Sequence, residues 1–277
     1  ATRTEVSGRS GLLADYPGAA AAYSLRLLDT DYTGSAIRVR RASDNAEQDI
    51  GFDGNGDLDT TVLATFCSGT DGFVKTWYDQ AGANDATQTT TTAQPKIYDS
   101  VAGVVTENGR PAVDFDGSND YLEKTNFAIT GTQALSSFSV GFGGATTSTG
   151  VFSIQGSIGS ADGYIQTTET GVRTGGGFVV FGAQSAINSS IVSTFFPADG
   201  NISDISCFIN NASSSVTGIS NNTINFGPNT TLTVASELSN QTFDGIVQEV
   251  ILYPSDQSSN RTGIETNIND YYDIYTP

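Results

Sequence analysis

The sequence contains no histidine, no methionine and only two cysteines among its 277 residues. Without histidine the chain cannot form a Ser-His-Asp triad, a Cys-His pair or a histidine-ligated zinc or haem site. Two cysteines are too few for a disulfide scaffold, so we expect Cys67 and Cys207 to be free and buried. The missing methionine indicates that the initiator has been removed or that the chain is a processed product.

Basic residues are also scarce. The chain has 12 Lys and Arg but 30 Asp and Glu, which gives a formal net charge of −18. Binding to nucleic acid relies on clustered Lys and Arg, and so does attraction to anionic membranes. No apolar run approaches the length of a membrane-spanning helix. We therefore expect no nucleic-acid partner and no membrane insertion. The chemistry that remains is that of carboxylates, calcium and neutral ligands such as sugars, or a structural role.

The abundant residues favour β-structure. The chain has 31 Gly, 15 Phe and 11 Tyr, together with many Thr, Ser and Asn. Such a composition predicts short strands joined by tight turns, and Asn-Gly or Asp-Gly turn signals recur along the chain. We predict an all-β, two-sheet sandwich of jelly-roll type with short peripheral helices. It would form one domain over residues 1–277, with a short N-terminal arm over about residues 1–15.

Helical signals are confined to regions near the ends of the chain and to one internal segment. Residues 18–28 follow Pro17 and are rich in Ala, residues 59–66 follow a capping Asp59, and residues 256–272 repeat apolar side chains at helical spacing. Strands are predicted at residues 73–78, 112–115, 138–142, 178–181, 204–209, 230–235 and 246–253.

One loop has the composition of a calcium site. Its oxygen-bearing side chains alternate with glycine or leucine: Asp53, Asn55, Asp57 and Asp59. Such a loop can wrap Ca²⁺, but Leu58 and Ala64 stand where an EF-hand has its glycine and its bidentate glutamate. The alternative is a polar turn that leads into a helix capped by Asp59.

Two other segments have side chains suited to a neutral glycan. Aromatic faces stack on sugar rings while carboxylates and amides bind the hydroxyls. The first segment combines the single Trp with three polar side chains: Trp77, Tyr78, Asp79 and Gln80. The second is a turn between two strands: Asp116, Asn119 and Asp120. The alternatives are a tryptophan in the core and a turn whose side chains cap its own backbone.

Several blocks resemble the catalytic domain of the α-L-arabinofuranosidase B family. They are Ala20–Gly34, Ile37–Asp44, Phe66–Gly69, Tyr78–Gly82, Asp244–Glu249 and Tyr253–Asp256. The resemblance covers roughly residues 18–97 and 231–275, and it implies a concanavalin A-like β-sandwich. The turn at Phe115–Tyr121 resembles one of laminin-G-like sandwiches, and similar blocks occur in surface and virion proteins of marine bacteria and phages.

The resemblance implies a retaining glycosidase that uses two carboxyl groups, but the pattern is altered at the implied positions. The family's nucleophilic Glu would fall at Gln166, and an amide cannot form the glycosyl–enzyme ester. Its acid/base Asp would fall at Glu237. A shift of a few residues in the alignment would instead place Glu169 in the role of the nucleophile. The family's adjacent cysteine pair is replaced by Gly150 and Val151.

From these departures we expect a non-catalytic, surface-displayed sandwich: a virion protein (capsid decoration or fibre) or a cell-surface structural or adhesion protein. It would be extracellular or on a virion surface, would associate with itself and with other virion or surface proteins, and would have neutral glycans as its candidate ligands. No cofactor is expected beyond Ca²⁺ at the loop described above. The alternatives are a retaining glycoside hydrolase of arabinofuranosidase type that uses Glu169 and Glu237, and a calcium-dependent lectin.

Overall fold

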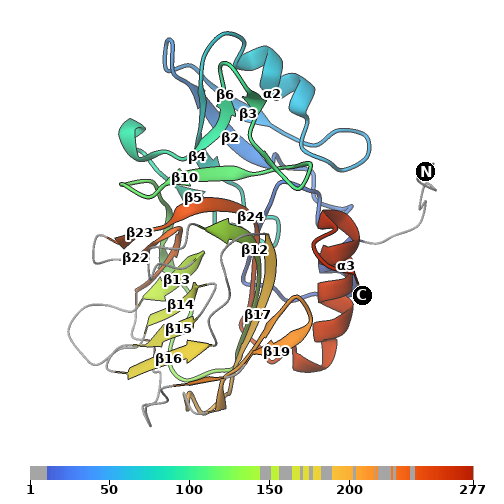
Figure 1. The fold of residues 1–277 in the computed structure, drawn as a ribbon, viewed down its shortest axis with the longest axis vertical. Helices are drawn as coiled ribbons and strands as arrows, with labels where there is room; N and C mark the ends of the chain where they lie inside the picture. The colour runs from blue at the N-terminus through green and yellow to red at the C-terminus, as the bar shows by residue number, and fades with distance from the viewer. Residues whose placement is uncertain are drawn as a thin grey trace.

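The computed structural model describes residues 11–143, 151–155, 164–168, 171–174, 177–181, 189–201, 204–214, 216–217, 226, 229–237 and 241–276. For residues 155, 164–168, 171–174, 177–181, 216–217, 236–237 and 241–242, what is described is the backbone alone. Antiparallel strands dominate these segments and form an all-β sandwich whose hydrogen-bonded ladder folds into two layers (Figure 1).

The first layer is built around one long strand, β24, which pairs with β12 along one edge and with β1 and β10 along the other. Beyond β12 the layer continues through β17, β18 and β19. Its strands are β1 (Ala21–Ser24), β10 (Val113–Asp116), β12 (Leu135–Gly143), β17 (Ser190–Phe196), β18 (Ser206–Ile209), β19 (Ala212–Ser214) and β24 (Asp244–Tyr253).

The second layer runs in the order β5, β11, β21, β13, β14, β15, β16 and β20. Its strands are β5 (Ala86–Thr87), β11 (Leu122–Phe127), β13 (Phe152–Gln155), β14 (Tyr164–Thr168), β15 (Gly171–Thr174), β16 (Gly177–Phe181), β20 (Val216–Thr217) and β21 (Thr230–Val234).

A third group of strands, at the top of Figure 1, joins the two layers, since β4 pairs with β5 and β6 pairs with β10. It contains β2 (Ile37–Arg41), β3 (Glu47–Ile50), β4 (Gly72–Trp77), β6 (Lys96–Asp99) and β7 (Gly103–Val104). Two small ladders stand apart: β8 (Thr106–Glu107) with β9 (Arg110–Pro111), and β22 (Ser236–Glu237) with β23 (Gln241–Thr242).

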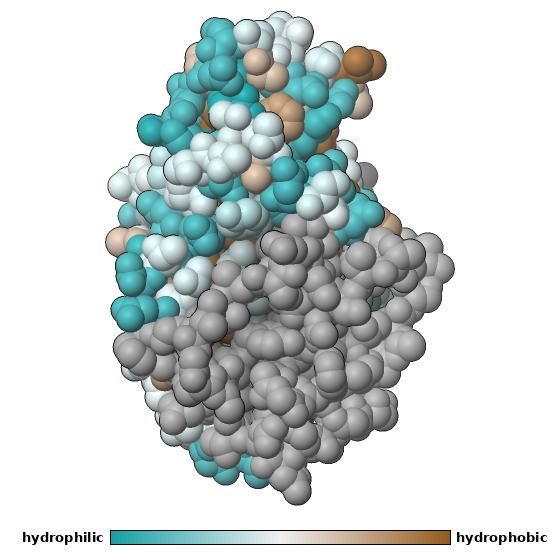
Figure 2. Space-filling model, turned by 90° about the vertical axis from the view of Figure 1, so that its left-hand side faces the viewer, coloured by the Kyte–Doolittle hydropathy of each residue, from teal (hydrophilic) through white to brown (hydrophobic). Residues whose placement is uncertain are grey.

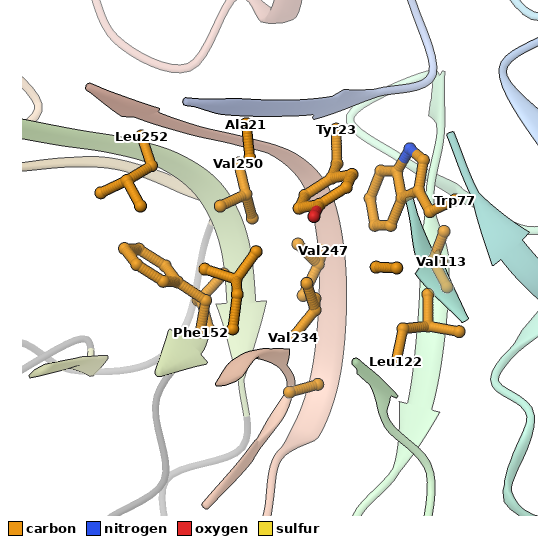
Figure 3. Close-up of a cluster of buried hydrophobic side chains, with 14 of the residues drawn as sticks. Ala21, Tyr23, Trp77, Val113, Leu122, Phe152, Val234, Val247, Val250 and Leu252 are labelled. Atoms are coloured by element: carbon orange, nitrogen blue, oxygen red, sulfur yellow. The ribbon is translucent and has the colours of Figure 1, made fainter. Parts of the chain in front are cut away.

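The main core lies between the layers, where side chains of β1 and β24 meet those of β11, β13 and β21 (Figure 3). A second core lies on the outer face of the first layer. Phe138 and Val140 of β12 point there because side chains alternate along a strand, and they pack with Ile264 and Ile268 of α3. The helices are α1 (Leu12–Asp15), α2 (Thr60–Phe66) and α3 (Arg261–Tyr272), with short 3₁₀ turns η1 (Thr91–Ala93) and η3 (Ser258–Asn260).

The helix predicted over residues 18–28 is wrong. Residues 21–24 form β1, which pairs with β24 from Ala21 opposite Leu252 to Ser24 opposite Glu249. All four residues of β1 are buried, so pairing and burial on both faces outweigh the helical propensity of alanine. The helices α2 and α3 are confirmed, and the side chain of Asp59 caps α2 by accepting a hydrogen bond from Val62 N.

The seven predicted strands are confirmed within a few residues at their ends. Cys67 and Cys207 are free and buried, as expected. None of the helices in the described segments is long and apolar enough to cross a membrane. Of the predicted N-terminal arm, residues 1–10 lie outside the described residues, and Leu12–Asp15 form α1.

Candidate functional site

The segments that carry the catalytic candidates lie on neighbouring strands of the second layer. Gln166 in β14 stands opposite Ser153 of β13, and Ser153 stands opposite Thr233 of β21. Glu237 follows in β22, directly after β21. The side chains of Gln166 and Glu237 lie outside the described ones, and Glu169 lies outside the described residues. The backbone therefore brings the two candidate segments to within two strands of each other.

Ser153 and Thr233 belong to the face of this layer that is turned away from the core. Their neighbours Phe152 and Val234 are fully buried between the layers, and successive side chains of a strand point to opposite faces. Ser153 and Thr233 are nevertheless also buried. The outward, polar face of the second layer is thus shielded from solvent where β13 and β21 pair.

The chain leaves β21 through a strained residue. Ala235 has a φ of 63°, in the left-handed region that residues with a Cβ adopt rarely. Its N–H donates to Val151 O at 2.9 Å and its carbonyl accepts from Phe243 N at 2.9 Å. These bonds fix the base of the β22–β23 hairpin, and therefore the backbone on which Glu237 stands. Strain held in this way is common at functional sites.

Trp77 does not offer its ring to a ligand. The side chain is fully buried, and its ring centroid lies 6.2 Å from that of Tyr23 inside the main core (Figure 3). The interpretation as a core tryptophan is therefore the right one, and stacking of a sugar on Trp77 is excluded by burial. Tyr78, which follows β4, is half-buried and donates its hydroxyl to Asp49 at 2.7 Å. Burial and the Asp49 carboxylate raise the pKa of Tyr78 to about 12.

Asp79 and Gln80 are buried and hold the chain together. The carboxylate of Asp79 accepts hydrogen bonds from the backbone N–H groups of Ala22, Ala81 and Asn84 at 2.8–3.0 Å. The amide of Gln80 accepts from Leu28 N and donates to the carbonyls of Ser24, at the end of β1, and Arg26. Burial raises the pKa of Asp79 despite these bonds. Both side chains tie β1 to the end of β4, and their role as glycan ligands stays a prediction.

The carboxylates of the predicted calcium loop each have different hydrogen-bond or ion-pair partners. Asp53 accepts from Asn55 N and Asp57 N, as in a polar turn, while Asp59 caps α2. Asp57 lies 3.4 Å from Arg110 Nη1. Within the described part of the chain, no three Asp, Glu or Cys side chains gather in an arrangement that could hold a metal ion. Calcium binding here stays a prediction.

The turn between β10 and β11 is acidic. Asp116 accepts hydrogen bonds from Ser118 N at 2.8 Å and Asn119 N at 3.3 Å, and its own N–H donates to Asp120 Oδ2 at 3.3 Å. Asp116 also stands opposite Asp244 of β24. Asp120 is only 6% exposed. Burial first, and the charge of Asp116 second, raise the pKa of Asp120 to about 7.

A buried ion pair, which the sequence did not reveal, links β24 of the first layer to the segment that follows β1. Glu249 of β24 accepts from Arg26 Nε at 2.8 Å, Arg26 Nη2 at 3.0 Å and Ser24 Oγ at 2.8 Å, with Tyr272 OH at 3.3 Å. Burial alone would lower the pKa of Arg26, but Glu249 raises it above its ordinary value. The partners are 223 residues apart in the chain, so no local pattern links them.

Comparisons with known proteins point to one family. Residues 13–122 match the model of the family described as "Alpha-L-arabinofuranosidase B, catalytic". No curated protein matches the chain. Among solved structures, a GH54 α-L-arabinofuranosidase soaked with a cyclic sulfate inhibitor is 18% identical, with a TM-score of 0.64 over 90% of this chain and 62% of that one. An arabinofuranosidase complexed with arabinofuranosyl-α-1,2-xylobiose is also 18% identical, with a TM-score of 0.65 over 93% of this chain and 64% of that one.

These findings overturn the expectation of a non-catalytic virion or surface protein. The matched family is one of catalytic domains, and the similar structures are glycoside hydrolases. The chain spans less than two thirds of the length of those hydrolases. At 18% identity the structural likeness shows the fold, and the sequence match covers residues 13–122. In sequence over that range and in fold over nine tenths of its length, the chain resembles the catalytic domain of the α-L-arabinofuranosidase B family.

Proposed function

We propose that this chain is the catalytic domain of a retaining glycoside hydrolase of arabinofuranosidase type, with Glu169 and Glu237 as its two carboxyl groups. The observation that carries the proposal is the match of residues 13–122 to the catalytic family. The placement of β14 and of the β22–β23 hairpin around the pair β13–β21 supports it.

Retention of configuration requires two carboxyl groups about 5 Å apart, one as nucleophile and one as acid and then base. Neighbouring strands lie about 4.8 Å apart, so the backbones of β14 and β21, separated by β13, lie about 10 Å apart. In the sequence Glu169 follows the end of β14, and Glu237 follows the end of β21. The strand order is therefore compatible with a double displacement.

The proposed nucleophile differs from the position that the family resemblance implies. Gln166 stands at the register position opposite Ser153, and its amide cannot form the covalent intermediate. We assign the nucleophile to Glu169, which in the sequence lies between the end of β14 at Thr168 and the start of β15 at Gly171. Glu237, on the hairpin that Ala235 holds in place, would protonate the departing oxygen and then activate water.

We propose that the substrate is a neutral glycan that carries arabinofuranosyl groups. The same glycan is the binding partner that we propose for this chain. A net charge of −18 favours approach to neutral polymers over anionic ones. Such polysaccharides are found outside cells, so we also propose an extracellular location.

The test is hydrolysis of 4-nitrophenyl α-L-arabinofuranoside by the wild-type chain and by single variants. Glu237→Gln is expected to lower kcat/KM by about 10²–10⁴-fold, and Glu169→Gln by at least as much. The matched control is Glu47→Gln, because Glu47 is an exposed glutamate of β3 that pairs with Lys75 and takes no part in the proposed reaction. The activity of the Glu47→Gln variant should stay within about two-fold of that of the wild type.

Two further variants separate the possible nucleophiles. Azide should restore turnover in Glu169→Gly, because a small anion can replace a missing carboxylate nucleophile. If Gln166→Glu gained activity while Glu169→Gln lost none, the nucleophile assignment would be wrong although the reaction class would survive. A wild-type chain that hydrolyses neither this substrate nor arabinosylated polysaccharide would refute the proposed function.

A further inference from the structure

Among the arginines whose side chains the structure describes, Arg40 of β2 is the one without a carboxylate partner. Each of the others has a carboxylate oxygen within 3.4 Å: Arg26, Arg38, Arg41, Arg110 and Arg261. Arg40 is nevertheless only 7% exposed. Arginine is rarely buried to this extent unless it is paired, because burial of an uncompensated charge is costly. Arg40 therefore lacks the counterion that its burial requires.

Neutral oxygens surround the guanidinium of Arg40. Its Nε donates to Gln94 Oε1 at 2.6 Å, its Nη1 to Asn45 Oδ1 at 2.9 Å and its Nη2 to Thr91 O at 3.0 Å. The centre of the guanidinium also lies 5.0 Å from the centroid of the Phe73 ring. A guanidinium has more N–H groups than these three acceptors use, so donors remain for a further oxygen.

Two acidic side chains beside Arg40 have cations of their own. Glu47 of β3 stands opposite Arg40, but its carboxylate lies 2.6 Å from Lys75 Nζ. Asp44, in the turn between β2 and β3, forms an ion pair with Arg41 at 2.7 Å. Burial lowers the pKa of Arg40, and the charge of Glu47 offsets this effect only in part. The neighbouring charges thus cancel in pairs and leave the charge of Arg40 unbalanced.

The outer end of the guanidinium lies toward the surface. Its Nε bonds to Gln94, which is buried, whereas its two Nη atoms bond to Asn45 and Thr91, which are exposed. Asn45 belongs to the turn between β2 and β3, and Thr91 begins η1. The surface at the top of the molecule, where the third group of strands lies, is largely hydrophilic (Figure 2). The Nη end is therefore the end of Arg40 that an ion from solvent would meet.

We propose that the Nη end of Arg40, between Asn45 and Thr91, binds a small oxyanion. Sulfate, phosphate and the carboxylate of an acidic sugar share the required chemistry, because their oxygens accept N–H groups of a guanidinium and their charge supplies the counterion. The bound anion would join the turn between β2 and β3 to η1. This inference goes beyond the proposed function and does not rest on it.

Thermal unfolding of the wild-type chain tests the site. The chain is melted in sodium sulfate and in sodium glucuronate, each compared with sodium chloride at the same ionic strength. A ligand that binds only the folded state raises the Tm, by about 2–4 °C at roughly ten times its dissociation constant. A site for tetrahedral oxyanions responds to sulfate, and a site for sugar carboxylates responds to glucuronate.

The most informative variant is Asn45→Asp, which keeps the size of the side chain. Aspartate tolerates the left-handed φ of 59° at this position, and its carboxylate would replace the amide oxygen that lies 2.9 Å from Arg40 Nη1. The chain then supplies the counterion itself. The Tm of the variant in sodium chloride should rise by about 2–4 °C, and the response to sulfate or glucuronate should disappear. Arg40→Gln should lose the response as well, and Asn45→Asp keeps the test valid if Arg40→Gln fails to fold.

The matched control is Asn126→Asp. Asn126 of β11 is also exposed and has a similar φ of 54°, so the substitution adds the same charge on a strand of the second layer. The response of this variant to both anions should equal that of the wild type. The control also accounts for sulfate itself, which stabilises folded proteins in general by exclusion from their surface.

Three outcomes would overturn the proposed anion site. The first is a wild-type Tm that is the same in all three salts. The second is an equal rise in the wild type, Asn45→Asp and Asn126→Asp, which would be a general effect of salt. The third is a response that is lost in Asn126→Asp as fully as in Asn45→Asp. None of these outcomes bears on the proposed hydrolase, which is tested by kcat/KM.

Discussion

Two of the buried carboxyl groups, Glu249 and Asp120, lie in contrasting surroundings. Glu249 is fully buried and meets the guanidinium of Arg26 with two hydrogen bonds, while Asp120 is 6% exposed and has other carboxylates as its charged neighbours. A buried carboxylate with a counterion is fixed in its charged form, whereas one without a counterion keeps its proton to a higher pH. The first arrangement serves to hold the fold, and the second leaves a group that can exchange protons near neutral pH.

The two groups also differ in what they connect. Glu249 joins β24 to the chain after β1 through Arg26 and to α3 through Tyr272, so three distant segments meet on one carboxylate. Asp120 contacts Asp116 of its own turn, and the neighbouring Gly117 packs against Asp244 of β24. The comparison therefore separates a carboxylate that joins distant segments from one whose contacts lie within its own turn.

The largest effect is expected from Glu249→Gln. The variant keeps the size of the side chain but leaves the guanidinium of Arg26 buried without a counterion, which costs about 3–5 kcal/mol of the free energy of unfolding. Urea denaturation followed by tryptophan fluorescence measures the loss, since Trp77 lies in the main core.

The control for this substitution is Asp49→Asn, which breaks the ion pair with Arg38 on the surface. Both side chains of that pair are 40% exposed, so the expected loss is at most about 1 kcal/mol. Equal losses of stability for the buried and the exposed pair would mean that the Arg26–Glu249 pair does not hold the fold more strongly than a surface pair does.

The next effect is the pH dependence of stability in Asp120→Asn. In the folded chain Asp120 keeps its proton up to about pH 7, whereas in the unfolded chain an aspartate loses it near pH 3.9. Between these values the unfolded state releases a proton that the folded state retains, so Asp120 lowers the stability of the wild type as the pH rises. The variant should be more stable than the wild type by roughly 1–3 kcal/mol at pH 8.

At pH 4 the difference between Asp120→Asn and the wild type should nearly vanish, because the wild-type carboxyl is then protonated in the folded chain and half protonated in the unfolded one. The measurement is the urea midpoint of both proteins from pH 4 to pH 8. A gap that stays constant over this range would mean that Asp120 does not titrate differently in the two states, and the contrast with Glu249 would fail.

Local patterns predicted most of the architecture. Asp59 caps α2, and the Asn108-Gly109 signal forms the turn between β8 and β9, with φ values of 51° and 73°. These features depend on neighbouring residues, which a sequence displays directly. The helix predicted at residues 18–28 failed because its outcome depends on β24, more than 200 residues away in the chain.

The candidate site was less accessible to sequence reasoning for the same reason. The acidic turn at Asp116–Asp120 was singled out from its residues, but its place between β24 and β21 follows from two strand pairings that no local pattern encodes. The resemblance of separate blocks indicated the family, while the substitution of Gln166 at one position led to the wrong functional expectation. A single altered residue is weak ground for excluding catalysis when a neighbouring carboxylate is available.

The smallest effect concerns how α3 is held over the Glu249 centre. Asn108 donates from its side-chain amide to the carbonyls of Tyr272 and Asp273 at 2.6 and 2.8 Å, where α3 ends. Asn108→Gly keeps the left-handed backbone of the turn but leaves these carbonyls without that donor, which should cost about 1 kcal/mol. Asn126→Gly is the control, because Asn126 is exposed with a similar φ of 54° and should change stability little. If both variants melt alike, the amide of Asn108 contributes nothing to anchoring α3, and the stability of that side of the sandwich must come from the Arg26–Glu249 pair and the apolar packing of the helix.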